Sequence, residues 1–331
     1  MKLTKMTAFA MTTALCATAA FADGHMDRTG WPESFTVGTA SQGGTYFAYG
    51  SGWANLVAEE LGMTGGGEVT GGPMQNMALV HTGEVAFGMT TMGPAAESLA
   101  GTNPIAPGLQ MTNACAMFPM YQTPFSVTAL SSSGITSIDE IPDGARIGFG
   151  PAGSTSDTYF PRMMEELGVN FERRNGGWSD LGGQLQDGLL DVIAFAAGVP
   201  VPAVSQLEVQ TDINIIEFTE EEQAQIMAAF PVSEFNISAD AYTTLEAPAR
   251  SVSMWNFAIA NSKQTSSPTR CSIKLSNSAT TEQEVPWQSC CSSELSRLLP
   301  TTSDNYAARG RNANDSSGTK ARGPEADQGS P

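Results

Sequence analysis

Residues 39–46 read Thr-Ala-Ser-Gln-Gly-Gly-Thr-Tyr, and residues 150–157 echo them with Gly-Pro-Ala-Gly-Ser-Thr-Ser-Asp. Each stretch follows a short apolar run that predicts a strand, at 35–38 and 146–149, and each precedes a helical pattern. The first turn of a helix leaves backbone N–H groups without intrahelical partners, and its dipole favours negative charge. Two such loops in one chain therefore predict a cleft that grips a small anion from both sides.

The order of predicted elements repeats along the chain. The first loop leads into helices at 45–61 and 73–81, with a strand at 68–70 between them and a strand within 83–90 after them. The second loop leads into the equivalent elements, which are helices at 154–167 and 179–190 and strands at 171–174 and 191–195. This internal duplication predicts two similar α/β lobes. The remaining elements are predicted as strands at 109–121, 125–130, 213–218 and 252–260 and helices at 93–99, 200–209 and 219–230.

The N-terminus has the features of a secretory signal peptide. Lys2 and Lys5 precede a short apolar core, and Ala20-Phe21-Ala22 provides a cleavage site, so residues 1–22 are expected to be removed after Ala22. No other segment approaches the roughly 20 apolar residues of a spanning helix. We therefore expect an exported, periplasmic protein without a membrane anchor.

Composition and motifs argue against several functions. The formal net charge is −18 and no lysine lies between residues 23 and 261, so we expect no nucleic-acid partner. No CxxC, HExxH, Walker or G-x-S-x-G pattern occurs, so no metal, cofactor or enzymatic activity is predicted. Cys115 is expected in the core, and His81 is interpreted as a surface or satisfied core residue rather than a catalytic base.

The two loops supply the first candidate contacts for a carboxylate. Backbone N–H groups and hydroxyls suit such a ligand, and Tyr46 is positioned to close over it. The alternative is that Thr45 and Ser154 only cap their helices. The loop candidates are Gly43, Gly44, Thr45, Gly153, Ser154 and Thr155.

Five segments occurring in order, at 41–47, 70–76, 83–87, 150–154 and 197–202, make the chain resemble the TAXI family over about residues 35–261. These are the solute-binding subunits of tripartite ATP-independent periplasmic (TRAP) transporters. The resemblance implies a two-lobed, type II-like periplasmic-binding-protein fold with mixed sheets flanked by helices and a two-strand hinge. Lobe 1 would comprise residues 23–128 and 251–261, and lobe 2 residues 129–250.

The resemblance also implies ligand and partners. The solute would be a glutamate-like amino acid, a dicarboxylate or a 2-oxo acid, and the partner of the expected monomer would be the TRAP membrane permease. Beyond the loops and Tyr46, the implied contacts are Gln75, Asn76, Ala197, Gly198, Val199 and Pro200. Met74-Gln75 departs from the family pattern, and Pro200 has the alternative role of shaping a turn.

Two further readings stay open at this point. A ligand sensor that signals to a membrane histidine kinase has the same sequence features, whereas an enzyme of the related fold lacks the base and metal ligands it would need. Residues 262–331 depart from the amphipathic helix that the resemblance predicts after the last strand. We interpret them as an atypical tail, either disordered or produced by a shifted reading frame.

Overall fold

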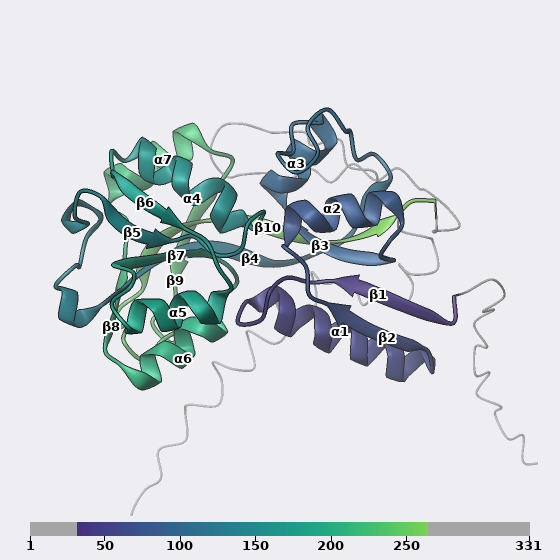
Figure 1. Ribbon diagram of the computed structural model, residues 1–331, viewed down its shortest axis with the longest axis horizontal. Coiled ribbons are helices and arrows are strands. Elements are labelled where there is room, and N and C mark those ends of the chain that lie inside the picture. The colour runs from purple at the N-terminus through teal and green to yellow at the C-terminus, as the bar shows by residue number, and fades with distance from the viewer. Residues whose placement is uncertain (1–31, 264–331) are drawn as a thin grey trace, which may run out of the picture. The chain divides into compact units, whose positions relative to one another are not determined.

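The computed structural model describes residues 32–263 (Figure 1). The predicted signal peptide and all but two residues of the predicted tail lie outside this range. Residues up to Glu33 form a unit separate from the rest of the chain. Of that unit only Pro32 and Glu33 are described, and both are exposed. Within the described range, no helix combines the length and the apolar character needed to cross a membrane.

The described part of the second unit is a mixed α/β fold. Its strands are β1 Ser34–Gly38, β2 Thr64–Glu68, β3 Phe87–Thr91, β4 Ala114–Leu130, β5 Ala145–Gly148, β6 Phe171–Arg174, β7 Val192–Ala196, β8 Ile213–Ile216, β9 Ser233–Ile237 and β10 Ala249–Asn261. Its α-helices are α1 Thr45–Leu61, α2 Pro73–Thr82, α3 Met92–Ala100, α4 Thr155–Glu166, α5 Trp178–Gln186, α6 Pro202–Gln210 and α7 Glu220–Ala229. Short 3-10 turns lie at Ser131–Ser133 and Ile138–Glu140.

The strand order is β2-β1-β3-β10-β4-β7-β5-β6, with β8 paired to β4 and β9 to β10. At one end β1 lies parallel to both β2 and β3, and at the other end β5 lies parallel to both β6 and β7. Each end follows the same chain order of strand, helix, strand, helix, strand. The duplication that the sequence predicts is therefore present in the topology.

Two long antiparallel strands, β4 and β10, connect the ends of the sheet. The sequence predicts two strands at 109–121 and 125–130, but the structure has one, which includes Pro119 and Pro124. Proline lacks the N–H that a ladder needs, and the register with β10 shifts between Trp255 and Phe257, opposite this region. β4 and β10 are the strands predicted as the hinge; that role and the division into two lobes stay predictions.

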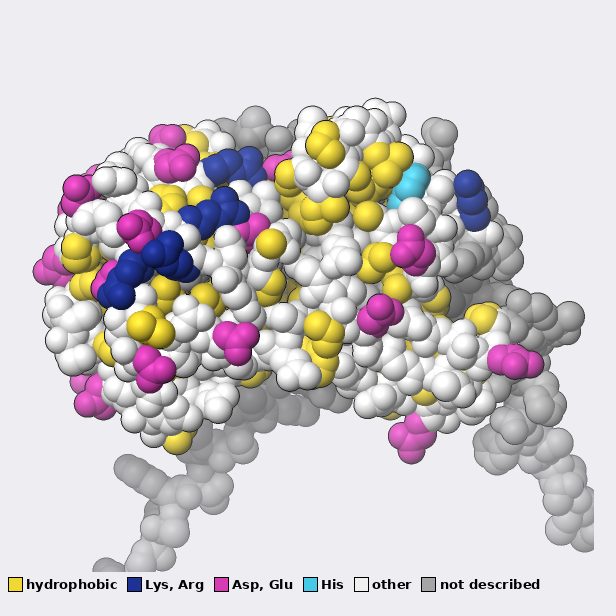
Figure 2. Space-filling view, viewed as in Figure 1, with side chains coloured by type: hydrophobic (Ala, Val, Ile, Leu, Met, Phe, Trp, Pro, Cys, Tyr) yellow, Lys and Arg dark blue, Asp and Glu magenta, His cyan; other side chains and the backbone are white. Residues whose placement is uncertain are grey.

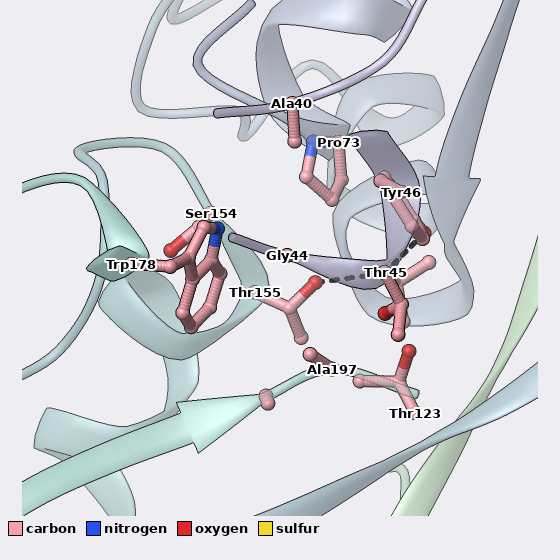
Figure 3. A pocket seen from close by; sticks show the side chains of 12 residues that line it. Ala40, Gly44, Thr45, Tyr46, Pro73, Thr123, Ser154, Thr155, Trp178 and Ala197 are labelled. Carbon is pink, nitrogen blue, oxygen red and sulfur yellow. Dashed lines mark hydrogen bonds between the residues drawn. The ribbon is translucent and has the colours of Figure 1, made fainter. Parts of the chain in front are cut away.

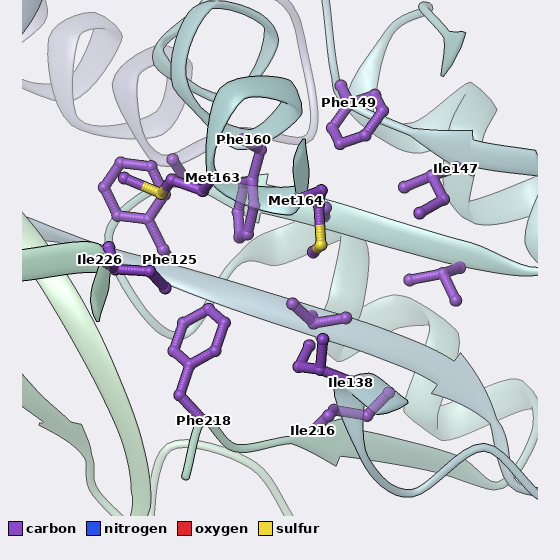
Figure 4. Packing of buried hydrophobic residues seen from close by; sticks show 14 of the residues in the cluster. Phe125, Ile138, Ile147, Phe149, Phe160, Met163, Met164, Ile216, Phe218 and Ile226 are labelled. Atoms are coloured by element: carbon purple, nitrogen blue, oxygen red, sulfur yellow. The ribbon is translucent and has the colours of Figure 1, made fainter. Parts of the chain in front are cut away.

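Helices cover both faces of the sheet (Figure 1). At the β5 end, α4 and α7 bury one cluster that includes Phe160, Met163 and Ile226, whereas α5 and α6 bury a second that includes Leu181 and Leu207. Figure 4 shows the first of these clusters. In it the rings of Phe125 on β4 and Phe160 on α4 pack edge-on, with their centroids 5.1 Å apart. At the other end, α2 and α3 share one cluster and α1 packs over β1 in another. A mixed sheet flanked by helices is the fold class that the sequence predicts.

Helix α1 has the predicted limits, and small residues form much of its buried face. Tyr46, Gly50 and Ala54 are buried, whereas Leu56 is 57% exposed. A Cβ on Gly50 would stand 2.6 Å from side-chain atoms of Met89 and Thr39, so the helix lies too close to the sheet for a large side chain there. Side-chain size was therefore a poor guide to the buried face.

Two other predictions needed correction, and one strand was missed. The strand predicted at 68–70 lies at Thr64–Glu68, where Gly65 packs against the Phe35 ring. Strand β9 was not predicted. The helix predicted at 179–190 ends at Gln186, so Leu189 lies beyond the end of α5 and is 56% exposed.

Candidate functional site

Five helices of the described chain begin at one pocket (Figure 3). Its lining includes the first residues of α2 and α5, the N-cap residue of α3, and both the N-cap and first residues of α1 and α4. Ala40, Thr123, Ala196 and Ala197 complete the wall together with Tyr46. The two loops predicted to share a cleft therefore face one pocket.

The electrostatic character of this pocket comes from the backbone. None of the described residues that line it carries a charged side chain. A helix N-terminus carries roughly half a positive elementary charge, and its unpaired N–H groups point outward along the axis. Several such ends around a pocket without charged side chains favour an anion inside it.

The N-terminus of α1 is open. Its N-cap is Gly44, which has no side chain, so no side-chain cap satisfies the first turn. Thr45 is the first helical residue and not the cap, which excludes the alternative that Thr45 merely caps this helix. The first turn of α1 contains no acidic residue either.

The N-terminus of α4 is partly filled by the chain itself. The Ser154 hydroxyl accepts a hydrogen bond of 3.1 Å from the Asp157 N–H, so Ser154 is a helix cap. The Asp157 carboxylate accepts bonds from the Gly153 N–H at 2.8 Å, from Asn175 at 2.5 Å and from Arg173. The two loops are therefore not equivalent, because the N–H of Gly153 already has an anionic partner.

A network of hydroxyl groups and one amide forms the floor of the pocket. The Tyr46 hydroxyl donates a 2.6 Å bond to Asn256 Oδ1 on β10, and the Thr91 and Thr123 hydroxyls bond to the same oxygen. Thr91 also lies 2.7 Å from the hydroxyl of Thr155 on α4. Burial raises the pKa of Tyr46 well above its usual value, so its hydroxyl stays neutral. Tyr46 thus belongs to the wall instead of closing over the pocket as predicted.

The first loop also binds the opposite end of the sheet. Thr45 Oγ1 accepts a 2.8 Å bond from the Gly198 N–H, and the Gly43 carbonyl accepts a 3.0 Å bond from the Ala203 N–H. A Cβ on Gly43 would lie 2.4 Å from Ser179 Oγ, and one on Gly44 would lie 2.7 Å from Trp178 Nε1. The glycines permit this close approach, so Gly43 and Gly198 act in the contact between the ends of the sheet.

Seven of the thirteen predicted contacts do not line the pocket: Gly43, Gly153 and Gly198, whose hydrogen bonds and packing are given above, and Gln75, Asn76, Val199 and Pro200. Gln75 Oε1 accepts the Gly71 N–H, and the fully buried Asn76 amide bonds to the carbonyls of Thr39 and Met89. Val199 and Pro200 lie outside the lining, within a bend at residues 197–200 in which Pro200 is exposed. Of the predicted set, the pocket is lined by Gly44, Thr45, Tyr46, Ser154, Thr155 and Ala197.

Sequence reasoning missed Trp178, which lines the pocket at the start of α5. The duplication contains a signal for it. Gly176-Gly177-Trp178 opens the second helix of its half as Gly71-Gly72-Pro73 does in the other, and Pro73 also lines the pocket. Thr91, Thr123 and Asn256 were missed as well, because they sit in strand patterns.

The arginines near this region lie on the surface (Figure 2). Arg146 pairs with Asp191, Arg162 with Glu97, Arg173 with Asp157 and Arg174 with Glu172, and none of them lines the pocket. Within residues 32–263, no group of three or more His, Cys, Asp and Glu side chains is arranged to hold a metal ion.

Several solved structures resemble this fold at low identity. The alkanesulfonate-binding protein SsuA from Xanthomonas axonopodis pv. citri, bound to MOPS, is 12% identical with a TM-score of 0.42, covering 70% of this chain and 66% of that one. SsuA from Escherichia coli is 13% identical with a TM-score of 0.40, covering 71% and 67%. A protein described as a periplasmic transporter is 13% identical with a TM-score of 0.48, covering 69% and 76%. The chain thus spans about two thirds of the length of the SsuA proteins.

A comparison with protein families gives a match over most of the chain. The matching model is described as the NMT1-like family and covers residues 37–274, which include every residue of the pocket. The chain therefore belongs to the NMT1-like family.

Proposed function

We propose that this protein is an exported solute receptor that binds a small organic anion and performs no chemistry on it. The observation that carries the proposal is the convergence of five helix N-termini on one pocket without charged side chains. Backbone N–H groups at helix starts bind carboxylates in fixed directions. Such a site holds an anion without needing an arginine or lysine.

The acidic composition of the chain does not oppose this proposal. The formal net charge is −18, but surface charges are screened over about 8 Å at physiological salt. The N–H groups of α1 act at contact distance, inside a pocket where screening is weaker. Local dipoles therefore outweigh the distant surface charge.

We further propose delivery of the solute to a TRAP-type permease. The five sequence segments shared with the TAXI family support this proposal, and membership of the NMT1-like family is consistent with it. In this scheme residues 23–128 and 251–261 form one lobe, residues 129–250 form the other, and β4 and β10 bend between them. The signal peptide would be cleaved after Ala22, placing the receptor in the periplasm.

Binding is tested by calorimetry and thermal unfolding of the mature chain with small mono- and dicarboxylates. Each acid is compared with the amide of the same carbon skeleton. A bound carboxylate at about 100 times its dissociation constant should stabilise the protein by about 2.7 kcal/mol, whereas the matched amide should not. Equal stabilisation by acid and amide, or none by any acid, would contradict an anion receptor.

The TRAP assignment has a separate test. Uptake of the identified anion should be measured in cells with and without the receptor gene. A secondary transporter should lose uptake when the ion gradient is dissipated. Uptake that continues without a gradient and stops on depletion of ATP would exclude the TRAP-type partner while leaving anion binding intact.

A further inference from the structure

We propose that Trp178 is a ligand-binding residue, and that it forms with the start of α1 a subsite for a small carboxylate lacking an ammonium group, such as a 2-oxo acid. This inference rests on the proposed anion receptor and narrows its ligand class. The indole N–H would donate one hydrogen bond to the ligand, and the first turn of α1 would donate others.

The indole N–H of Trp178 is buried without a partner. The residue is 4% exposed, and Nε1 makes no hydrogen bond within the described part of the chain. Buried polar groups are nearly always hydrogen-bonded, and Trp178 lines the pocket, so we infer that a bound ligand supplies the acceptor that the described chain does not. A carboxylate or keto oxygen supplies one, because indole is a donor only.

The Trp178 ring is held in place on several sides. It packs edge-on against Phe195 with centroids 4.5 Å apart. A Cβ on Gly150 would stand 3.0 Å from the far edge of the ring, and a Cβ on Gly44 would stand 2.7 Å from Nε1. The ring is therefore fixed before a ligand arrives, which reduces the entropy lost on binding.

The donor lies next to the open end of α1. The contact between Gly44 and Nε1 places the indole N–H beside the helix start that has no cap (Figure 3). Both groups line the same pocket and come from opposite ends of the sheet. One carboxylate with two oxygens matches two donors that converge from different directions.

Within the described chain, the lining offers no anionic partner for an ammonium group. No carboxylate lines the pocket among the described residues, and the Asp157 carboxylate in the first turn of α4 already bonds to Gly153, Asn175 and Arg173. The hydroxyls of Thr91 and Thr123 are bound to Asn256. A buried ammonium group would lose its hydration free energy, and no carboxylate in the lining would compensate for that loss. Amino acids should therefore be rejected.

The test compares two matched pairs by calorimetry on the mature full chain. Pyruvate is set against alanine, and 2-oxoglutarate against glutamate. We expect one oxo acid to bind at least about tenfold more tightly than its amino acid, which is about 1.4 kcal/mol. An amino acid that binds as tightly as its oxo acid would overturn the ligand class.

The role of Trp178 is tested with the same ligands. Trp178→Phe removes the N–H, and 3-benzothienylalanine at position 178 removes it while keeping the shape of the ring. Both should raise the dissociation constant at least about tenfold, while Trp53→Phe, in an aromatic contact with Phe87 and outside the pocket lining, should leave it unchanged. Unchanged affinity in the benzothienyl variant overturns the donor role, even if Trp178→Phe fails to fold. Failure of every carboxylate to bind would instead refute the anion receptor and this inference together.

Discussion

The Tyr159 hydroxyl on α4 donates a 3.0 Å hydrogen bond to the Glu97 carboxylate on α3, and this bond joins the two ends of the sheet. Arg162 donates to the same carboxylate at 3.2 Å, and its guanidinium lies 4.4 Å from the centre of the Tyr159 ring. Burial, with a contribution from Glu97, raises the pKa of Tyr159, so its hydroxyl remains a donor at neutral pH. The ends of the sheet are thus tied together outside the pocket.

Removing this tie should lower stability in a graded way. Glu97→Ala leaves the Tyr159 hydroxyl buried without an acceptor, and we expect a loss of about 1–3 kcal/mol in the free energy of unfolding. Glu97→Gln keeps an acceptor oxygen and should lose less. Unfolding in urea should be measured for both variants, for Tyr159→Phe and for the double variant Glu97→Ala/Tyr159→Phe. The double-mutant cycle should give a coupling energy of about 1 kcal/mol between Glu97 and Tyr159. Strictly additive losses would show that the two groups do not interact.

A methyl group at Gly44 should impair ligand binding because it displaces the Trp178 indole. The backbone there has φ −100°, which alanine adopts without strain, but the new Cβ would meet Trp178 Nε1 at 2.7 Å. We expect Gly44→Ala to weaken carboxylate affinity at least about tenfold, or about 1.4 kcal/mol, in calorimetry. Gly52→Ala on the same helix is the matched control. A Cβ there meets nothing within 4 Å, so that variant should gain up to about 1 kcal/mol of stability and bind normally.

The Asp157 carboxylate should be a strong structural group. Its loss would leave the partly buried Gly153 N–H without its acceptor and release the contacts with Asn175 and Arg173. We expect Asp157→Ala to reduce the free energy of unfolding by about 3 kcal/mol. Asp180 also lies in the first turn of a helix, α5, but is exposed, and its replacement by alanine should change stability by less than about 0.5 kcal/mol. Similar losses in both variants would mean that Asp157 acts only through the helix dipole.

His81 should make stability depend on pH in the mildly acidic range. Its Nδ1 accepts a 3.1 Å bond from the Asn113 N–H, and burial together with the charge of Lys263 lowers its pKa. A depressed pKa means that the folded state resists protonation. The stability that neutral His81 contributes is therefore fully present above its unfolded-state pKa of about 6.5. It is lost as the pH falls through the lower pKa of the folded state.

The matched variant for this effect is His81→Gln, which keeps an acceptor but does not titrate. The melting temperatures of the two proteins should be compared at pH 7.5 and at pH 5. We expect the wild type to lose more than the variant over this interval. Parallel decreases would assign the acid sensitivity to other groups.

Much of the fold could be predicted because local signals agree with it. Gly44 and Gly62 flank α1, and Gly62 adopts the left-handed conformation with φ 60° that ends the helix. The two prolines within β4 misled the prediction, because they suggested two separate strands. Pairing with β10 keeps this stretch as one strand. The glycine-rich strand β2 was misplaced, since glycine carries no strand signal.

The candidate site was predictable where it lies on the duplicated loops. Gly44, Thr45, Ser154 and Thr155 were found because a loop of small residues before a helix signals an anion site. The internal carboxylate of Asp157 could not be read from the sequence in this way, because an acid in the first turn of a helix is common there. Trp178 looks like a core residue in the sequence, and only the packing against Gly44 reveals its donor at the pocket.

Thr45 should slow ligand release through its contact with Gly198. The Thr45 hydroxyl accepts a 2.8 Å hydrogen bond from the Gly198 N–H. Thr45→Val keeps the shape but removes the acceptor, which leaves a buried N–H unpaired in the bound form. We expect the dissociation rate of a bound carboxylate to rise about tenfold in stopped-flow measurements, equivalent to about 1.4 kcal/mol. Thr45→Ser keeps the oxygen and should release ligand at nearly the wild-type rate. If the valine and serine variants release ligand equally fast, the methyl group matters more than the hydroxyl, and the contact with Gly198 does not hold the two ends of the sheet together around the ligand.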